Sequence, residues 1–170
     1  KWYDDGDERF RPGNILVNAR NIDTMYIVDK QTKMVVWEGT HNYKSGMSHS
    51  HEPEMIEKGL PGAGNIILFD NGLFTRNRIH TGQSFVVELN PVTQEVVWVY
   101  ETKGYANIKF FSKTMGTQRR LPNGNTYIAE DNKGRLFQVK PDGEIVWEFV
   151  NRGGTTRPDA VLDGGGPGPG

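Results

Sequence analysis

The sequence predicts an all-β protein made of about three four-stranded antiparallel propeller blades, which form an incomplete ring. Three observations support this fold class. Glycine accounts for 21 of 170 residues and stretches with a helical period are scarce, which favours a β domain with many turns. Trp37, Trp98 and Trp147 each lie in a run of Val or Ile. A Gly-Asn pair, two strands, a turn and a tryptophan strand occur in this order three times, about 50–60 residues apart, as in propeller blades.

Each repeat is expected to contribute three short strands after its Gly-Asn pair. In the first repeat these are Ile15–Val17, Asp23–Asp29 and Met34–Glu38. In the second they lie in the segments 66–69, 85–89 and 95–100, and in the third in the segments 126–132, 136–139 and 144–150. The segments are rich in Val, Ile and aromatic residues and are separated by turn residues. The variable stretch before each Gly-Asn pair can hold a fourth strand.

The three blades are expected to occupy residues 1–152, approximately as 1–47, 48–108 and 109–152, followed by a tail at 153–170. The tail is rich in glycine and proline, so it is expected to be disordered or extended. Three blades are too few for a closed propeller, which has about 4–8. We expect another chain, a second copy or missing N-terminal blades to close the ring, and the absence of a methionine at Lys1 favours a longer polypeptide. The alternative architecture is a two-sheet sandwich.

Composition and motifs exclude several classes of function. The formal net charge is -1, so there is no global reason to expect nucleic-acid binding. No apolar run approaches the roughly 20 residues that span a bilayer, so no membrane span is expected. The chain contains no cysteine, which excludes disulfides and thiolate ligands. It also has no serine nucleophile elbow, Walker loop or Rossmann glycine pattern, so no cofactor is predicted.

The densest chemistry lies in the stretch Ser48–Gly72, with the sequence SHSHEPEMIEKGLPGAGNIILFDNG. His49 and His51 would face the same side of an extended chain. The segment before a Gly-Asn strand lies near the innermost strand of a blade, which lines the central channel. His51 is therefore the first candidate for a nucleophile, a general base or a metal ligand, with His49 beside it and a structural role as the alternative. Asn71-Gly72 after an apolar run predicts a hairpin turn.

A metal site is the alternative chemistry for the His-x-His pair. The pair would supply two imidazoles, and further ligands could come from His41, His80, Glu52 or Glu54,. This spacing alone is weak evidence, so no metal is predicted.

Three arginines and one threonine complete the set of candidates. Arg20 follows the first strand of its blade, and its guanidinium suits a sulfate, phosphate or carboxylate. Arg76 and Arg78 are expected to be solvated loop charges. Thr114, with its neighbour Lys113, occupies the place in the third blade that the two histidines occupy in the second. Its side chain could therefore face the same channel.

The sequence resembles the bacterial arylsulfotransferases, which are periplasmic or secreted six-bladed propellers. The resemblance covers roughly Asp4 to Asn151 and matches the C-terminal half of such a protein. It rests on the segments NILVNARNIDTMYIVDKQTKMVVWEG, HEPEMIEKGLPGAGNIILFDNG, ELNPVTQEVVWVYE and TQRRLPNGNTYIAEDNKGRLFQVKPDGEIVWEF.

The resemblance implies transfer of a sulfuryl group from an aryl sulfate to a phenol without a nucleotide donor. His51, in the motif HEP, matches the family's histidine nucleophile, which forms a sulfohistidine. Arg20 matches an arginine that neutralises charge on the sulfuryl oxygens. His49 and Thr114 are expected to bind substrate, Thr114 by a loose match to a threonine lining the site. The family also uses a further histidine and a His-x-Asn pair from blades that would precede Lys1. The alternative function is a non-catalytic propeller subunit, a structural or binding element of a larger assembly.

Overall fold

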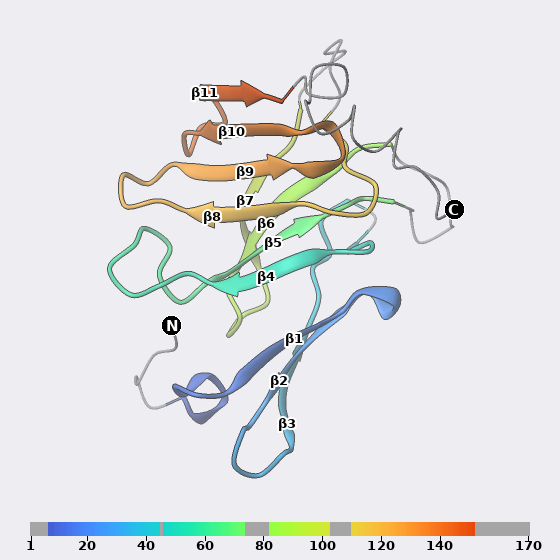
Figure 1. Ribbon diagram of the computed structural model, residues 1–170. Helices are drawn as coiled ribbons and strands as arrows, with labels where there is room; N and C mark the ends of the chain where they lie inside the picture. The colour runs from blue at the N-terminus through green and yellow to red at the C-terminus, as the bar shows by residue number, and fades with distance from the viewer. Residues whose placement is uncertain (1–6, 45, 74–81, 103–109, 152–170) are drawn as a thin grey trace, which may run out of the picture.

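A computed structural model of the protein contains three antiparallel β-sheets (Figure 1). The structure describes residues 7–44, 46–73, 82–102 and 110–151. The first sheet consists of β1 (Ile15–Ala19), β2 (Thr24–Val28) and β3 (Val35–Gly39). The second consists of β4 (His51–Met55), β5 (Ile66–Asp70), β6 (Phe85–Leu89) and β7 (Val96–Tyr100). The third consists of β8 (Thr117–Arg120), β9 (Thr126–Glu130), β10 (Arg135–Val139) and β11 (Ile145–Val150).

These sheets confirm the predicted all-β, propeller-like fold, and they do not close into a ring. In the second and third sheets the stretch before the Gly-Asn pair forms a fourth strand, β4 or β8, as expected. The first sheet differs, because the described residues before β1 form the 3-10 helix η1 (Glu8–Phe10) instead of a strand. Asp7 caps this helix through its carboxylate, and Phe10 is buried in the core. Among the described residues, no helix has the length and apolar character needed to cross a bilayer.

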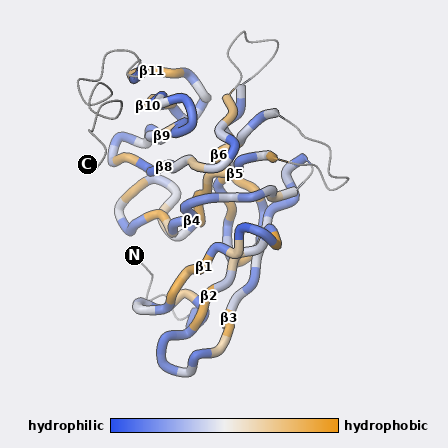
Figure 2. Tube along the Cα trace, turned by 45° about the vertical axis from the view of Figure 1, so that its right-hand side comes forward, coloured by the Kyte–Doolittle hydropathy of each residue, from blue (hydrophilic) through white to orange (hydrophobic). Residues whose placement is uncertain are grey.

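The central strands of the second sheet are apolar on both faces, because this sheet packs against the other two. All five residues of β5 are buried. Ile66 and Leu68 belong to a cluster that they share with the first sheet. Ile67 and Phe69 belong to a cluster that they share with the third sheet. Side chains alternate between the faces of a strand, so one continuous apolar run contributes to both cores. Figure 2 shows the hydrophobic segments along the strands and hydrophilic residues at the turns.

A buried ion pair joins the second and third sheets. The Arg120 guanidinium on β8 contacts the Glu88 carboxylate on β6, and both side chains are almost fully buried. Glu88 also accepts a hydrogen bond of 2.6 Å from the Asn65 side chain. The guanidinium carbon of Arg120 lies 5.2 Å from the centre of the Trp98 ring. A charged pair inside a core needs such additional partners, because each charge loses its hydration.

Asn71 and Gly72 do not form the predicted hairpin turn. The next strand, β6, begins at Phe85, so the connection is far longer than a two-residue loop, and its residues 74–81 lie outside the described residues. The Asn71 side chain is fully buried and binds backbone groups of another blade. The Gly72 N–H donates to the Asp70 carboxylate at 2.8 Å. Asn71 therefore acts as a contact between blades.

Candidate functional site

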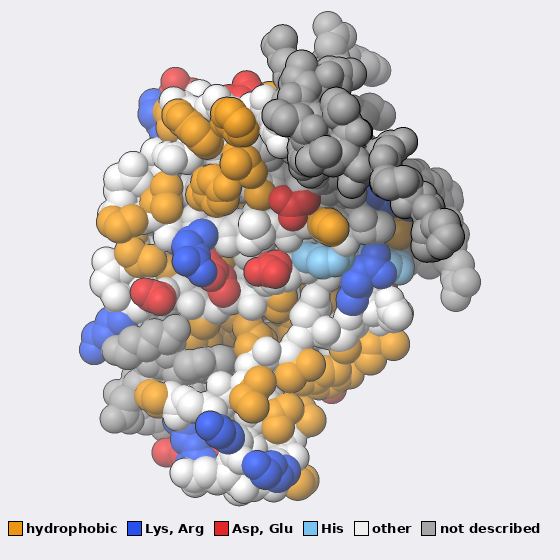
Figure 3. Space-filling view, viewed as in Figure 1, with side chains coloured by type: hydrophobic (Ala, Val, Ile, Leu, Met, Phe, Trp, Pro, Cys, Tyr) orange, Lys and Arg blue, Asp and Glu red, His pale blue; other side chains and the backbone are white. Residues whose placement is uncertain are grey.

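His51 is the first residue of β4, and its ring Nδ1 faces two acceptors. The side-chain Oδ1 of Asn71 lies 2.6 Å from this nitrogen, and the backbone carbonyl oxygen of His49 lies 3.2 Å from it. His51 as a residue is half-buried. Figure 3 shows histidine side chains on the surface of the molecule, beside acidic and basic side chains.

The surroundings of Asn71 determine which nitrogen of His51 carries the proton. Asn71 Nδ2 donates to the carbonyl oxygens of Ser112, at 2.6 Å, and Met115, at 3.0 Å. Carbonyls can only accept, so the amide nitrogen must point towards them and Oδ1 must point towards His51. The His49 carbonyl is also only an acceptor. Nδ1 of His51 is therefore the protonated nitrogen of the neutral ring, and Nε2 keeps its lone pair.

His49 has a different environment, and it does not alternate with His51 along an extended strand. It precedes β4 and adopts a left-handed backbone conformation, with φ of 58°, whereas alternation requires extended residues. Its backbone N–H donates to the Asp23 carboxylate at 2.7 Å. Its ring Nδ1 lies 3.3 Å from the Ser48 hydroxyl oxygen and 3.8 Å from the nearer Asp23 oxygen. The two histidines thus hydrogen-bond to different blades.

The residues on either side of Arg20 in the chain contact the histidine segment. Arg20 is the first residue of the 3-10 helix η2 (Arg20–Ile22), directly after β1. Two residues earlier, the Asn18 side chain donates to the Ser50 carbonyl at 2.6 Å and accepts from the Ser50 hydroxyl at 3.0 Å. Asp23 holds the backbone of His49 as described above. Arg20 as a residue is half-buried, and its guanidinium donates an exposed hydrogen bond of 3.2 Å to the Asn21 side chain.

Thr114 lies in the segment of the third blade that is anchored by Asn71. Its neighbour Met115 accepts from Asn71, which links this segment to His51. The Thr114 side chain is exposed, and its backbone N–H donates to the Asn132 side chain at 3.0 Å. In the strand ladder, however, Thr117 pairs with Ala129 in the way that His51 pairs with Phe69. Thr117 therefore stands at the strand position of His51, three residues beyond Thr114.

Three residues share one position of the repeat, and two of them are linked to His51. Arg20, Asn71 and Asp131 each stand seven residues after the glycine of a Gly-Asn pair and directly follow an equivalent strand. Burial raises the pKa of the Asp131 carboxyl, and the nearby Glu52 raises it further, while His51 opposes this. Asp131 therefore lies within electrostatic reach of His51, although it belongs to the next blade. Only Arg20 was predicted from the sequence to have a role in the site, although counting from each Gly-Asn pair finds the other two as well.

The residues considered for a metal site do not come together in the part of the chain that the structure describes. His41 is buried, with Nε2 2.9 Å from Asp70 Oδ2, and its Nδ1 accepts from the Tyr43 N–H at 3.3 Å. Asp70 also accepts from the backbone N–H of Ser48 at 3.1 Å, which fixes the residue before His49. No group of three possible ligands occurs among the described residues. His80, Arg76 and Arg78 lie outside those residues.

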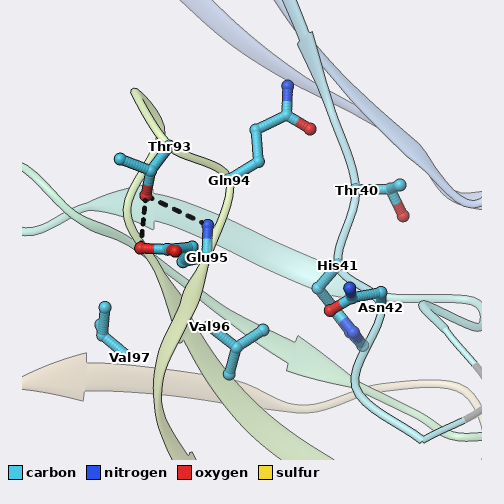
Figure 4. Close-up of a pocket in the computed structure, with 8 residues that line it drawn as sticks. All are labelled: Thr40, His41, Asn42, Thr93, Gln94, Glu95, Val96 and Val97. Carbon is cyan, nitrogen blue, oxygen red and sulfur yellow. Dashed lines mark hydrogen bonds between the residues drawn. The ribbon is translucent and has the colours of Figure 1, made fainter.

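A cavity of about 620 Å³ does not include the candidate site (Figure 4). It is an open groove between the segment that follows β3 and the turn between β6 and β7. Its lining residues are Thr40, His41, Asn42, Thr93, Gln94, Glu95, Val96 and Val97. At the edge of this groove, the Thr93 hydroxyl donates to the Glu95 carboxylate. None of the residues predicted to be catalytic or to bind substrate lines this groove.

Comparison with known families agrees with the arrangement of the repeats. The sequence model of the arylsulfotransferase (ASST) family matches residues 8–152. The chain belongs to the arylsulfotransferase family. No curated protein shows significant similarity to it. The matched region begins at η1 and extends just beyond β11, so this arylsulfotransferase segment includes all three sheets and every candidate residue discussed above.

The tautomer of His51 is testable by NMR spectroscopy in this arylsulfotransferase segment. We expect ¹⁵N chemical shifts of neutral His51 to show a protonated Nδ1 and an unprotonated Nε2, because Asn71 and the His49 carbonyl both accept from Nδ1. Asn71→Ala removes the stronger acceptor, so the Nε2-protonated form should become populated. Asn132→Ala is the matched control, because it removes a neighbouring asparagine that accepts from the Thr114 N–H but leaves both acceptors of His51 Nδ1 in place. A protonated Nε2 in the parent protein would contradict the assignment.

Glu54 lies on β4, three residues after His51. Its carboxyl is expected to make the stability of the protein depend on pH. Burial raises its pKa above the ordinary value of 4.5, and Arg119, 3.6 Å away, partly opposes the shift. A raised pKa in the folded state means that the contribution of Glu54 to the unfolding free energy falls as pH rises from 4.5 through the folded pKa. Urea denaturation of Glu54→Gln should show a smaller loss of stability over this window than the parent. The control is Glu95→Gln, at an exposed turn, which should keep the parent's pH dependence of stability. If Glu54→Gln showed the same pH dependence as the parent, the prediction would be contradicted.

Proposed function

We propose that His51 transfers a sulfuryl group from an aryl sulfate to a phenol through a covalent intermediate. The observation that carries this proposal is the contact between His51 Nδ1 and Asn71 Oδ1 at 2.6 Å, in a chain that belongs to the arylsulfotransferase family. The contact leaves Nε2 unprotonated, as a nucleophile must be. The half-buried position of His51 is compatible with access by a small aryl ester.

The proposed reaction has two displacement steps at sulfur. In the first, the Nε2 lone pair of His51 attacks sulfur, the bond from sulfur to the aryl oxygen breaks, and the electron pair leaves with the aryl oxide. The sulfohistidine ring then carries a positive charge, which the Nδ1–H shares with the Asn71 oxygen through a hydrogen bond that strengthens as the charge develops. In the second step a phenolate oxygen attacks sulfur, the nitrogen–sulfur bond breaks, and neutral His51 is restored.

Arg20 is proposed to bind the sulfuryl oxygens, with His49 and Thr114 as further contacts to substrate. A guanidinium at this place would stabilise negative charge on the oxygens in the transition state. Support for Arg20 comes from the two bridges that its neighbours Asn18 and Asp23 make to the backbone of the histidine segment. Thr114 is supported by the link from Asn71 to Met115. The reaction needs no nucleotide donor, and a periplasmic or secreted location is part of the same proposal.

Steady-state kinetics test the proposed reaction. With a chromogenic aryl sulfate as donor and a phenol as acceptor, a covalent intermediate predicts ping-pong behaviour, in which double-reciprocal plots at different acceptor concentrations are parallel. Intersecting lines would indicate direct transfer between two bound substrates and would contradict a sulfohistidine. The measurement requires the assembled ring, because we propose that blades beyond the three described sheets complete the site.

A second candidate function is a non-catalytic blade segment that serves as a structural or binding element of a larger assembly. The observation that favours it is the open arrangement of three sheets, in which the outer strand β11 is exposed along its whole length. Absence of phenol release from a folded sample with a closed ring would support this function over sulfuryl transfer.

A further inference from the structure

The strand that carries His51 contains a β-bulge directly after this residue. In the ladder between β4 and β5, His51 pairs with Phe69 and Glu54 pairs with Ile67, and the register shifts between these two pairs. The segment Glu52–Pro53 therefore places two residues opposite a single residue of β5, which is the pattern of a bulge. Proline has no N–H to donate to a ladder, so it suits this position.

The bulge determines which residue of β4 stands opposite Phe69. The equivalent strand β8 pairs with β9 in one continuous register, in which Thr117 stands opposite Ala129. β8 covers this stretch with four residues, whereas β4 uses five. If β4 had no bulge, Glu52 would stand opposite Phe69, and His51 would move to the other face of the sheet. The bulge thus presents His51 instead of Glu52 at this position.

The bulge also turns His51 towards the third sheet. Directly paired residues lie on the same face of a sheet, so His51 shares the face of Phe69, which belongs to the cluster between the second and third sheets. Met55, four residues after His51, belongs to the cluster shared with the first sheet. In a regular strand, residues four apart share a face. The extra residue separates these two and brings the His51 ring to Asn71.

Gln118 holds the bulge from the third sheet. It lies on β8, beside β4 (Figure 1), and its Nε2 donates to the Glu52 carbonyl at 2.6 Å and to the Ile67 carbonyl at 3.2 Å. Because carbonyls only accept, the amide nitrogen must point towards them. Gln118 is 2% exposed, and its Oε1 has no hydrogen-bond partner among the residues that the structure describes. The buried amide therefore serves as a donor to the bulge.

The backbone of Glu52 explains why the bulge needs such a contact. Its φ is 49°, a region in which the Cβ of a residue other than glycine is crowded. A conformation of this kind persists only where the surrounding contacts hold it, and it is common at functional sites. The hydrogen bond from Gln118 acts on the carbonyl of this same residue.

We propose that Gln118 is a positioning residue for His51, because it holds the bulge that turns the imidazole towards Asn71. Its catalytic consequence rests on the proposed function, in which His51 is the nucleophile, whereas the placement of the ring does not. Asn71 is anchored on carbonyls of the third blade and acts on the ring, while Gln118 acts on the backbone. The third blade thus controls both the direction and the protonation of His51.

The first test compares Gln118→Met with Gln138→Met by NMR spectroscopy. Methionine keeps the size of glutamine and removes the donor, and it also removes the unpaired Oε1, so the protein should remain folded. In Gln118→Met, the ¹⁵N shifts of His51 should show a populated Nε2-protonated form, because the ring leaves Asn71. Gln138 lies on β10, on the face of the third sheet opposite to Gln118, so its variant should keep the parent shifts. Parent shifts in a folded Gln118→Met would overturn the proposal.

A pair of variants at Glu52 tests the bulge itself. Asparagine tolerates a positive φ, whereas the β-branched valine does not, and both substitutions remove the carboxylate. Glu52→Asn should therefore keep the parent ¹⁵N shifts of His51, and Glu52→Val should change them in the direction seen in Gln118→Met. Equal His51 shifts in the two variants, with both proteins folded by circular dichroism, would overturn the role of the bulge.

Kinetics of the assembled protein connect this placement to sulfuryl transfer. A displacement of about 1 Å in a reacting group can cost about 10²-fold in rate, so Gln118→Met should lower kcat by this order. KM for the aryl sulfate should change little, because the proposed contacts Arg20 and Thr114 lie outside the bulge. A change in KM alone would overturn the positioning role. If the parent forms no sulfohistidine, the proposed function fails, and the NMR comparison still decides whether Gln118 places His51.

Discussion

Replacing His51 with alanine is expected to lower the rate of sulfuryl transfer by about 10³-fold or more, because the reaction loses its covalent nucleophile. The ring of His51 is the only part of the site to which we assign bond formation with sulfur. Its Nδ1 is already bound by Asn71 at 2.6 Å, so the effect reflects loss of Nε2. The measurement is the release of a chromogenic phenol by the assembled protein, with acceptor in excess.

His49→Ala is the matched control for this loss. His49 is held by its backbone on Asp23 and lies two residues before the proposed nucleophile. As a substrate contact, it should affect mainly KM and leave the transfer of sulfur to the protein intact. Loss of turnover in His49→Ala with near-normal turnover in His51→Ala would reverse the two roles and contradict the assignment of the nucleophile.

Removing one partner of the buried pair between Glu88 and Arg120 is expected to have the largest effect on stability. Both side chains are about 5% exposed, and Arg120→Met would leave the Glu88 carboxylate buried with Asn65 as its remaining hydrogen-bond partner. An uncompensated buried charge typically costs about 3–5 kcal/mol. Urea denaturation should therefore show a loss of this size in the unfolding free energy of Arg120→Met.

A second variant separates loss of the ion pair from loss of packing. The double substitution Glu88→Leu with Arg120→Met removes both charges, so it should recover much of the stability lost in Arg120→Met. Arg119→Met is the control, because Arg119 is adjacent in sequence and its side chain is 72% exposed. A loss in Arg120→Met no larger than that in Arg119→Met would show that the pair does not hold the second and third sheets together.

The repeat pattern was sufficient to predict the architecture, because it is expressed in local residue types. Gly-Asn pairs, apolar runs and tryptophans recur at matching intervals, and the strands β5, β6 and β7 lie within one residue of the segments expected for them. The departure in the first sheet arose from residues before Gly13, where Asp7 caps a short helix instead of a strand forming. A capping contact of this kind carries no signal at the period of the repeat.

The site was less predictable, because its contacts join different blades. His51 and Arg20 could be chosen from motifs, but Asn71 was interpreted as a turn residue, since Asn-Gly after a strand is typical of hairpins. Its actual partners are 41 and 44 residues away in the sequence. His49 was placed by alternation, which failed because its backbone is left-handed. The repeat marks the position of Asn71, but it carries no signal for the distant partners of that side chain or for a single left-handed backbone conformation.

Intact-mass measurement after mixing the assembled protein with an aryl sulfate, followed by peptide mapping, tests the proposed mechanism most directly. Without acceptor, the sulfohistidine should accumulate, and we predict a mass gain of one sulfuryl group on the peptide that contains His51. Addition of a phenol should remove the gain and yield the aryl sulfate of that phenol. Release of phenol with no modified peptide, or modification at a residue other than His51, would contradict the proposed mechanism.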